Sequence, residues 1–197
     1  MNIPNCWSEV SIRQLIEINE VKDNLSFNNY LKVAATLTGA TEKEIKALPV
    51  EEFVKVIDEV NEFFQTAPAV VLRKSITLNG HEYHLRDIGD YSTGDFIDAD
   101  TLATGDDKDK VPLLLALAYT ESGVESTPDN IKERANRLLG LDCETALGGL
   151  DFFSKALLKF ALNTVESSNS ARMNEKTKKK LEEWKKQIIA LTDGGGN

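Results

Sequence analysis

The sequence has few of the residues that disulfide frameworks, metal sites and membrane spans require. Its 197 residues include only two cysteines, Cys6 and Cys143, and two histidines. Two cysteines so far apart form neither a disulfide framework nor a metal-ligand spacing, and they are typical of a reducing cytosol. No apolar run reaches the roughly 18 residues of a transmembrane helix, and we expect no signal peptide because the first residues have no basic start and no apolar stretch.

Positive charge is also scarce. The chain has 23 lysines and arginines against 32 acidic residues, which gives a net charge of −9. Bare nucleic acid and anionic membranes would repel such a protein, so we expect it to bind neither. Hydrophobic residues make up 41% and charged residues 28% of the chain. These values are typical of a globular protein, with one domain or one domain and an appendage at this length.

The first third of the chain has a helical pattern. Ser11 with Gln14 and Thr41 with Glu44 have the spacing of capping boxes, which predicts a helix after each. A further helix is expected over residues 27–38 and ends at a glycine. Pro49 then suits the first turn of a longer helix. Its apolar residues form a stripe typical of an amphipathic helix: Val50, Phe53, Val54, Ile57, Val60 and Phe64.

A β-hairpin is predicted around residues 69–86. Asn79-Gly80 is a strong two-residue turn signal, because both turn positions need a positive φ. The turn pairs position 78 with 81, 76 with 83 and 74 with 85. One face of the hairpin should therefore cover the helices, and a lone hairpin must pack on something or gain a third strand. The residues of that face are Ile76, Leu78, Tyr83 and Leu85.

Residues 87–109 are markedly acidic, with eight aspartates and one lysine. Their spacing does not match a calcium loop, because the positions that should supply oxygen ligands and glycine hold apolar residues. We interpret them as a short helix from Thr93 to Ala103 and a solvated loop. Ser92 or Thr93 is the expected N-cap, with Asp95 in the first turn.

The second half is predicted to be helical as well. Residues 111–120 are almost entirely apolar and should form a buried central helix. Thr127-Pro128 predicts a helix start and Gly140 a helix stop. Asp142 should cap the next helix, whose apolar stripe runs past a weak point at Gly148-Gly149.

The C-terminal residues have the opposite charge. Residues 171–187 contain seven basic and three acidic residues, after a polar linker. Four apolar residues, two within this stretch and two just after it, have spacings of 3, 4 and 3, as in a short helical seam. This seam could dock on the protein's own core or bind a partner, and its residues are the predicted partner-binding set: Leu181, Trp184, Ile188 and Leu191.

No catalytic, cofactor-binding or metal-binding residue is predicted. His81 and His84 lie three residues apart on a strand, so their rings should point to opposite faces. Gly89 and Gly94 have the spacing of a phosphate loop, but Asp95 stands where a lysine is needed. Cys143 is the best candidate for a nucleophile, because a helix N-terminus lowers a thiol pKa, but a buried small hydrophobe is the favoured interpretation.

The sequence therefore predicts a mainly α fold with minor β: a multi-helix globular domain, one hairpin and a C-terminal amphipathic helix. Residues 1–166 are expected to form the helical domain with the inserted hairpin and acidic loop. Residues 167–197 are expected to hold the linker, the basic amphipathic helix and a flexible tail.

Three stretches together resemble small proteins of tailed bacteriophages, most of all the tail assembly chaperones. They are residues 7–15, residues 76–85, and residues 91–98 with the apolar run 113–119. The resemblance covers roughly residues 7–120. It implies a non-enzymatic protein of the host cytoplasm, active during assembly, that binds the tape-measure protein and keeps it soluble.

Other functions stay open. A structural subunit of the virion, from the neck, tail or baseplate, fits the same resemblance and would be located in the particle. An acidic regulator that mimics nucleic-acid charge fits less well, because the acidic residues are concentrated in one segment. An enzyme ranks last. The expected partners are tape-measure or tail proteins, or a second copy of the chain, and no cofactor is expected.

Overall fold

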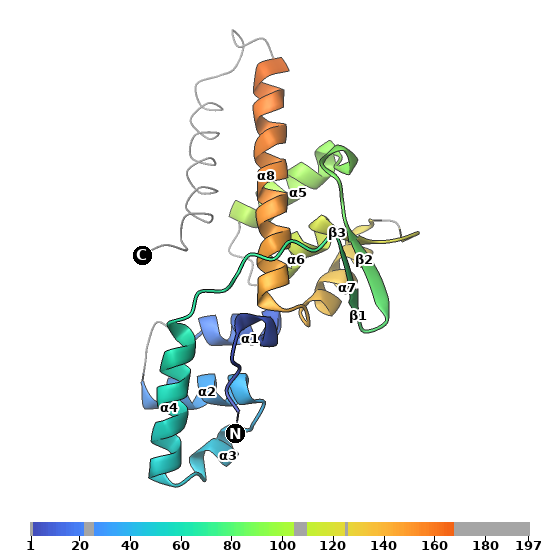
Figure 1. Ribbon diagram of the computed structural model, residues 1–197. Helices are drawn as coiled ribbons and strands as arrows, with labels where there is room; N and C mark the ends of the chain where they lie inside the picture. The colour runs from blue at the N-terminus through green and yellow to red at the C-terminus, as the bar shows by residue number, and fades with distance from the viewer. Residues whose placement is uncertain (1, 22–25, 105–109, 125, 168–197) are drawn as a thin grey trace.

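The computed structural model describes residues 2–21, 26–104, 110–124 and 126–167 (Figure 1). The fold is mainly α with a small antiparallel sheet, as the sequence predicts. The α-helices of the described residues are α1 (Ile12–Asn19), α2 (Phe27–Thr38), α3 (Glu42–Lys46), α4 (Val50–Phe64), α5 (Thr93–Thr104), α6 (Lys110–Ala118), α7 (Pro128–Leu138) and α8 (Cys143–Ser167). Two short 3-10 helices, η1 (Trp7–Glu9) and η2 (Ile88–Asp90), and three strands, β1 (Ser75–Leu78), β2 (His81–Leu85) and β3 (Tyr119–Glu121), complete them.

The predicted helix boundaries follow local hydrogen-bonding chemistry. Both predicted capping boxes form: at α1 the Ser11 side chain accepts from the Gln14 amide, and at α3 Thr41 does the same with Glu44. Helix α2 ends at Gly39, which has a φ of 70° and provides the left-handed C-cap. Pro49 stands one position earlier than predicted, at the N-cap of α4.

The hairpin has the predicted register. Ile76 pairs with Tyr83 and Leu78 with His81, around a turn in which Asn79 and Gly80 have φ values of 52° and 82°. The sheet order is β1-β2-β3, so the hairpin gains its third strand. This strand corrects the prediction of a helix over residues 111–120: α6 ends at Ala118, because the next three residues pair with β2.

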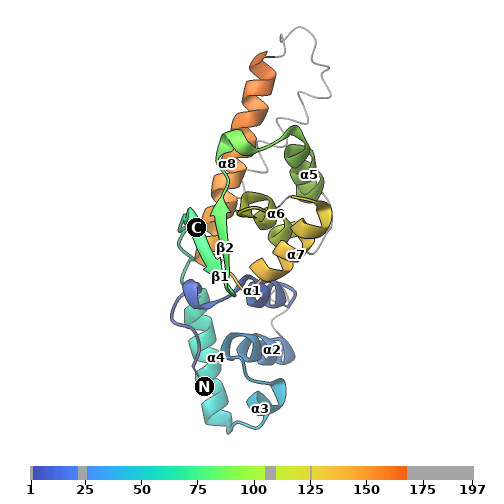
Figure 2. The same ribbon diagram turned by 90° about the vertical axis from the view of Figure 1, so that its right-hand side faces the viewer.

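Two hydrophobic cores lie one above the other (Figure 2). The N-terminal core is formed mainly by α1 to α4. The C-terminal core lies between the sheet and helices α5 to α8, and its centre is α6, where Leu115 and Ala116 have no exposed surface. Because α6 is apolar on every side, it must be surrounded by other elements.

The start of α1 and the turn before α8 join the two cores. The amides of Ile12 and Arg13 donate to the carbonyls of Leu141 and Leu139, both over 2.9 Å, and the amide of Cys143 donates to the Val10 carbonyl. Helix α1 also contributes side chains to both cores. These backbone bonds satisfy groups that the helix ends would otherwise leave unpaired.

Helix α8 continues without a break through Gly148-Gly149. A Cβ atom at Gly148 would lie 2.2 Å from the backbone oxygen of Val71, and one at Gly149 would lie 2.5 Å from the Tyr119 ring. Burial raises the pKa of Tyr119 to about 12, so its phenol stays protonated and donates to the Arg73 carbonyl over 2.8 Å. We call this site the α8 notch: the two glycines, Val71 and Tyr119.

Helix α4 is turned away from the orientation that its stripe suggests. An apolar stripe normally faces the core. The buried residues of α4 are instead Val56, Val60 and Phe63, and only Val60 belongs to the predicted stripe. Part of the stripe therefore lies on the surface.

Candidate protein-binding surface

The exposed part of the α4 stripe forms an apolar patch with the start of α2. Val50 is 79% exposed, Phe27 65% and Val54 51%. The rings of Phe27 and Phe53 contact each other with centroids 5.0 Å apart, which joins the two helices. We call Phe27, Val50, Phe53 and Val54 the α2–α4 patch. Single exposed apolar residues are common, but a contiguous group is typical of an interaction site.

Helical geometry explains why these residues gather. Val50 and Val54 are four residues apart, so they lie one above the other on the same side of α4, with Phe53 beside them. Ser26 caps α2 by accepting a hydrogen bond from the Asn29 amide, and this fixes where Phe27 begins the helix. The hydroxyl of Tyr30 on α2 donates to Asn61, which lies further along α4, over 3.2 Å. This hydrogen bond holds the two helices together.

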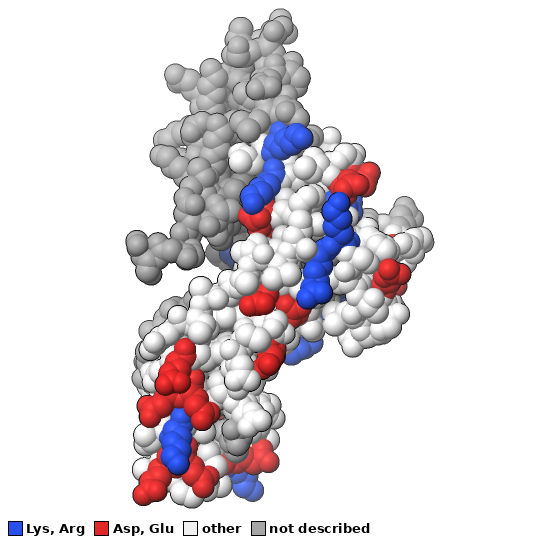
Figure 3. All heavy atoms as spheres, in the orientation of Figure 1, with Lys and Arg blue, Asp and Glu red and all other residues white. Residues whose placement is uncertain are grey.

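The solvent face of α4 is acidic. Five carboxylates and one lysine, all exposed, occupy the turns beside the apolar patch. Figure 3 shows acidic side chains gathered over this helix in the lower part of the molecule. With a net charge of −4, this face favours a basic partner, and we call it the acidic face of α4. Its residues are Glu51, Glu52, Lys55, Asp58, Glu59 and Glu62.

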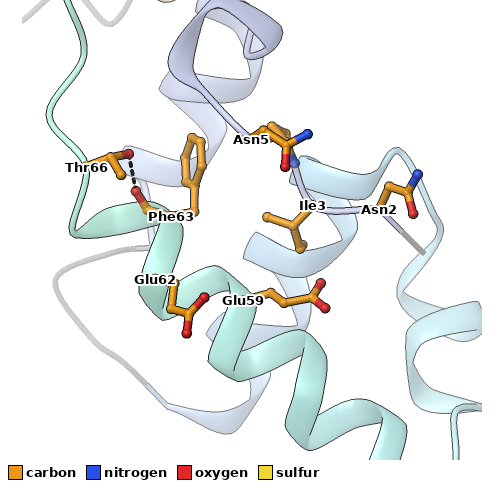
Figure 4. Close-up of a pocket in the computed structure, with 8 residues that line it drawn as sticks. Asn2, Ile3, Asn5, Glu59, Glu62, Phe63 and Thr66 are labelled. Atoms are coloured by element: carbon orange, nitrogen blue, oxygen red, sulfur yellow. Dashed lines mark hydrogen bonds between the residues drawn. The ribbon is translucent and has the colours of Figure 1, made fainter.

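A groove of 580 Å³ is lined in part by the acidic face of α4 and by none of the patch residues (Figure 4). It runs between the N-terminal segment, where Ile3 lies, and the last turns of α4. Just beyond it, the Trp7 indole donates to the carbonyl of Thr66 over 2.7 Å and anchors this segment to the end of α4. The two glutamates of the groove, Glu59 and Glu62, add to the negative charge of the same helix.

Both histidines lie on β2 beside carboxylates. His81 Nδ1 lies 2.7 Å from a carboxylate oxygen of Glu121, while His84 lies 3.8 Å from Glu82. The hydrogen bond with His81, helped by Arg137 at 2.9 Å, lowers the pKa of Glu121 although burial raises it. Within the described residues, no group of three or more histidine, cysteine, aspartate or glutamate side chains could hold a metal ion.

The described part of the acidic segment has a structural role. As predicted, Ser92 caps α5: its hydroxyl accepts from the Asp95 amide, and the Asp95 carboxylate accepts from the Ser92 amide over 2.7 Å. Both oxygens of Asp95 also accept from Arg86 over 2.9 Å, and the Arg86 guanidinium lies 4.4 Å from the centre of the Tyr91 ring. Burial raises the pKa of Asp95, but the hydrogen bonds from Arg86 and Ser92 together lower it.

Cys143 lies at the start of α8 with no exposed surface. Burial, followed by the neighbouring carboxylates of Asp142 and Glu144, raises the pKa of its thiol to about 12. The helix N-terminus therefore does not activate this cysteine, which packs as a small apolar residue of the N-terminal core.

The predicted partner-binding residues Leu181, Trp184, Ile188 and Leu191 lie outside the described residues. The α2–α4 patch was not predicted as a site. A signal for it was present: α4 has more apolar positions than one face can bury, since Val56 and Phe63 lie outside the predicted stripe.

Comparison with known proteins identifies no relative. A scan against protein-family models, a search of curated proteins and a search of solved structures each found no match. Among the described residues, no helix is both long enough and apolar enough to cross a membrane.

Proposed function

We propose that the protein is a non-enzymatic assembly protein of a tailed bacteriophage, and that it acts as a tail assembly chaperone by binding other phage proteins. The observation that carries its binding role is the α2–α4 patch, where Phe27, Val50 and Val54 stay largely exposed beside an acidic helix face. The phage setting rests on the sequence resemblance.

The mechanism follows from the shape of this surface. An apolar patch along a helix accepts the apolar side of a partner helix, in the manner of helix-in-groove recognition. The acidic face beside it then selects partners with basic residues next to the apolar side, and it repels acidic ones. A chaperone of this kind would shield an apolar helix of a long tail protein until assembly.

Co-purification with the tape-measure protein of the same phage tests this function. We expect the wild-type chain to bind it, and the double variant Val50→Asp, Val54→Asp to lose at least about tenfold in affinity, as expected when about 1.4 kcal/mol of contact is removed. Val70→Asp is the matched control, because Val70 is 61% exposed but lies outside the patch. Equal binding by the wild type and the double variant would contradict the proposal.

The free edge of β1 favours a second candidate, a structural subunit of the virion. In the described sheet β1 is an edge strand, and a hollow of 310 Å³ lies between it and residues 140–145. An unpaired strand edge can add a strand of a neighbouring subunit. Mass spectrometry of purified particles separates the two candidates, because a subunit is retained in the particle and a chaperone is absent from it.

A further inference from the structure

We propose that the α2–α4 patch binds the basic C-terminal residues 172–191 of a second copy of this chain. This inference rests on the proposed binding role of the patch. When no client protein is bound, the C-terminal residues of a second copy occupy the patch. The two surfaces carry opposite charge: the acidic face of α4 has five carboxylates and one lysine, whereas residues 171–187 have seven basic and three acidic residues.

The apolar residues of the two surfaces also match. In the patch, Val50 and Val54 are exposed at a spacing of four residues. The C-terminal sequence repeats apolar residues at spacings of 3, 4 and 3, from Leu181 to Leu191, with a run of three lysines just before Leu181 and two more directly after Trp184. Apolar contact would supply the stability of such a complex, and the flanking charges would set its orientation and partner choice.

The distance between the C-terminal end of α8 and the patch favours a second copy as the partner. The end of α8 and the start of α4 lie at opposite ends of the molecule (Figures 1 and 2). Helices of 25 and 15 residues are about 37 Å and 22 Å long. Even fully extended, the chain from Ser167 to Leu181 covers roughly 48 Å. The two helices laid end to end are longer than this reach, so the patch is more accessible to the seam of a second copy.

A contact between different surfaces of two copies is heterologous. It closes into a dimer when the two copies exchange their C-terminal residues, and it continues into longer assemblies when they do not. A tail protein with a basic amphipathic helix would compete for the same patch, so client binding would separate the copies.

Mixing two full-length variants tests the contact. The patch variant is Val50→Asp, Val54→Asp, and the segment variant is Leu181→Asp, Ile188→Asp. We expect the wild type to self-associate with increasing concentration in sedimentation velocity, and each variant alone to do so at least about tenfold more weakly. An equimolar mixture should form a one-to-one heterodimer, because one variant retains the patch and the other the segment.

Two controls and a separate assay distinguish self-association of the chain from client binding. Val70→Asp should associate as the wild type does, and added salt should weaken association, because salt screens exposed charges. A mixture that stays monomeric, or a wild-type chain that is monomeric at all concentrations, overturns the contact between copies. Client binding is measured independently by co-purification, so either idea can fail while the other holds.

Discussion

The α8 notch and the α2–α4 patch show two opposite uses of helix surface. At the notch, α8 has no side chain at Gly148, so the extended chain at Val71 lies directly on the helix backbone. At the patch, α4 has large apolar side chains, and Val50 is 79% exposed. The first surface is closed by the chain's own backbone, whereas the second is left open.

The difference separates residues that hold the fold from residues available for binding. The notch also joins distant parts of the chain, because the Val71 amide donates to the Glu144 carbonyl over 3.1 Å and the Tyr119 hydroxyl reaches Arg73. A change in the notch should therefore act on stability, and a change in the patch on association.

Gly148→Ala should have the largest effect. Its Cβ would lie within 2.7 Å of three backbone atoms of Val71 and Leu72, which cannot move aside as a flexible side chain can. We expect a loss of about 3 kcal/mol in the free energy of unfolding, at the upper end of overpacking costs, although alanine is the better helix former. Chemical denaturation measures it.

Gly89→Ala is the matched control for that substitution. Nothing lies within 4 Å of a Cβ at Gly89, and its φ is not positive, so the stability should change by less than about 0.5 kcal/mol. If both alanine variants were equally stable, this would contradict the close contact between Gly148 and the backbone of Val71.

Asn79→Pro should destabilise the C-terminal core by about 2 to 3 kcal/mol. Asn79 has a φ of 52°, and proline is restricted to a φ near −65°. Gly80→Val should have a similar effect, because Gly80 has a φ of 82°. The comparison variant Asp106→Asn, expected to leave stability unchanged, falls outside the described residues. Equal melting temperatures for all three variants would contradict the turn.

Asp95→Asn should cost about 2 kcal/mol at neutral pH, because it removes charge-assisted hydrogen bonds and leaves Arg86 without its anion. The pKa of Asp95 lies below its ordinary value of 3.8 in the folded protein. A lowered carboxyl pKa stabilises the fold above that value, and this contribution is lost as the pH falls through the folded pKa. The stability difference between wild type and variant should therefore shrink below about pH 4, as denaturation at several pH values would show. A constant difference would mean that the charge of Asp95 plays no part.

Local chemistry made much of the fold predictable from sequence. Capping residues such as Ser11 and Thr41, and the turn at Asn79, act through neighbouring residues, and their predicted roles are confirmed. The strand Tyr119–Glu121 was missed because it follows an apolar helix directly and three residues are too few to show a strand pattern, so only pairing with β2 decides.

The binding surface depends on tertiary contacts and was therefore harder to predict. Periodicity gives the apolar positions of α4, but not which side the neighbouring helices cover. Val56 and Phe63 pack inward because α2 and the N-terminal segment lie there, and Val54 is turned outward as a result. The function of the C-terminal residues stays a prediction.

Val54→Ala and Val60→Ala make the smallest and sharpest comparison, since both lie on α4. Val60 has no exposed surface, so its truncation should cost about 2 kcal/mol through lost burial and a cavity. Val54 is 51% exposed, so the same change should cost less than about 0.5 kcal/mol and act instead on association. Thermal melts read beside sedimentation measure both. If Val54→Ala destabilised the chain as much as Val60→Ala, the patch would be part of the core, and the proposed binding surface would be lost.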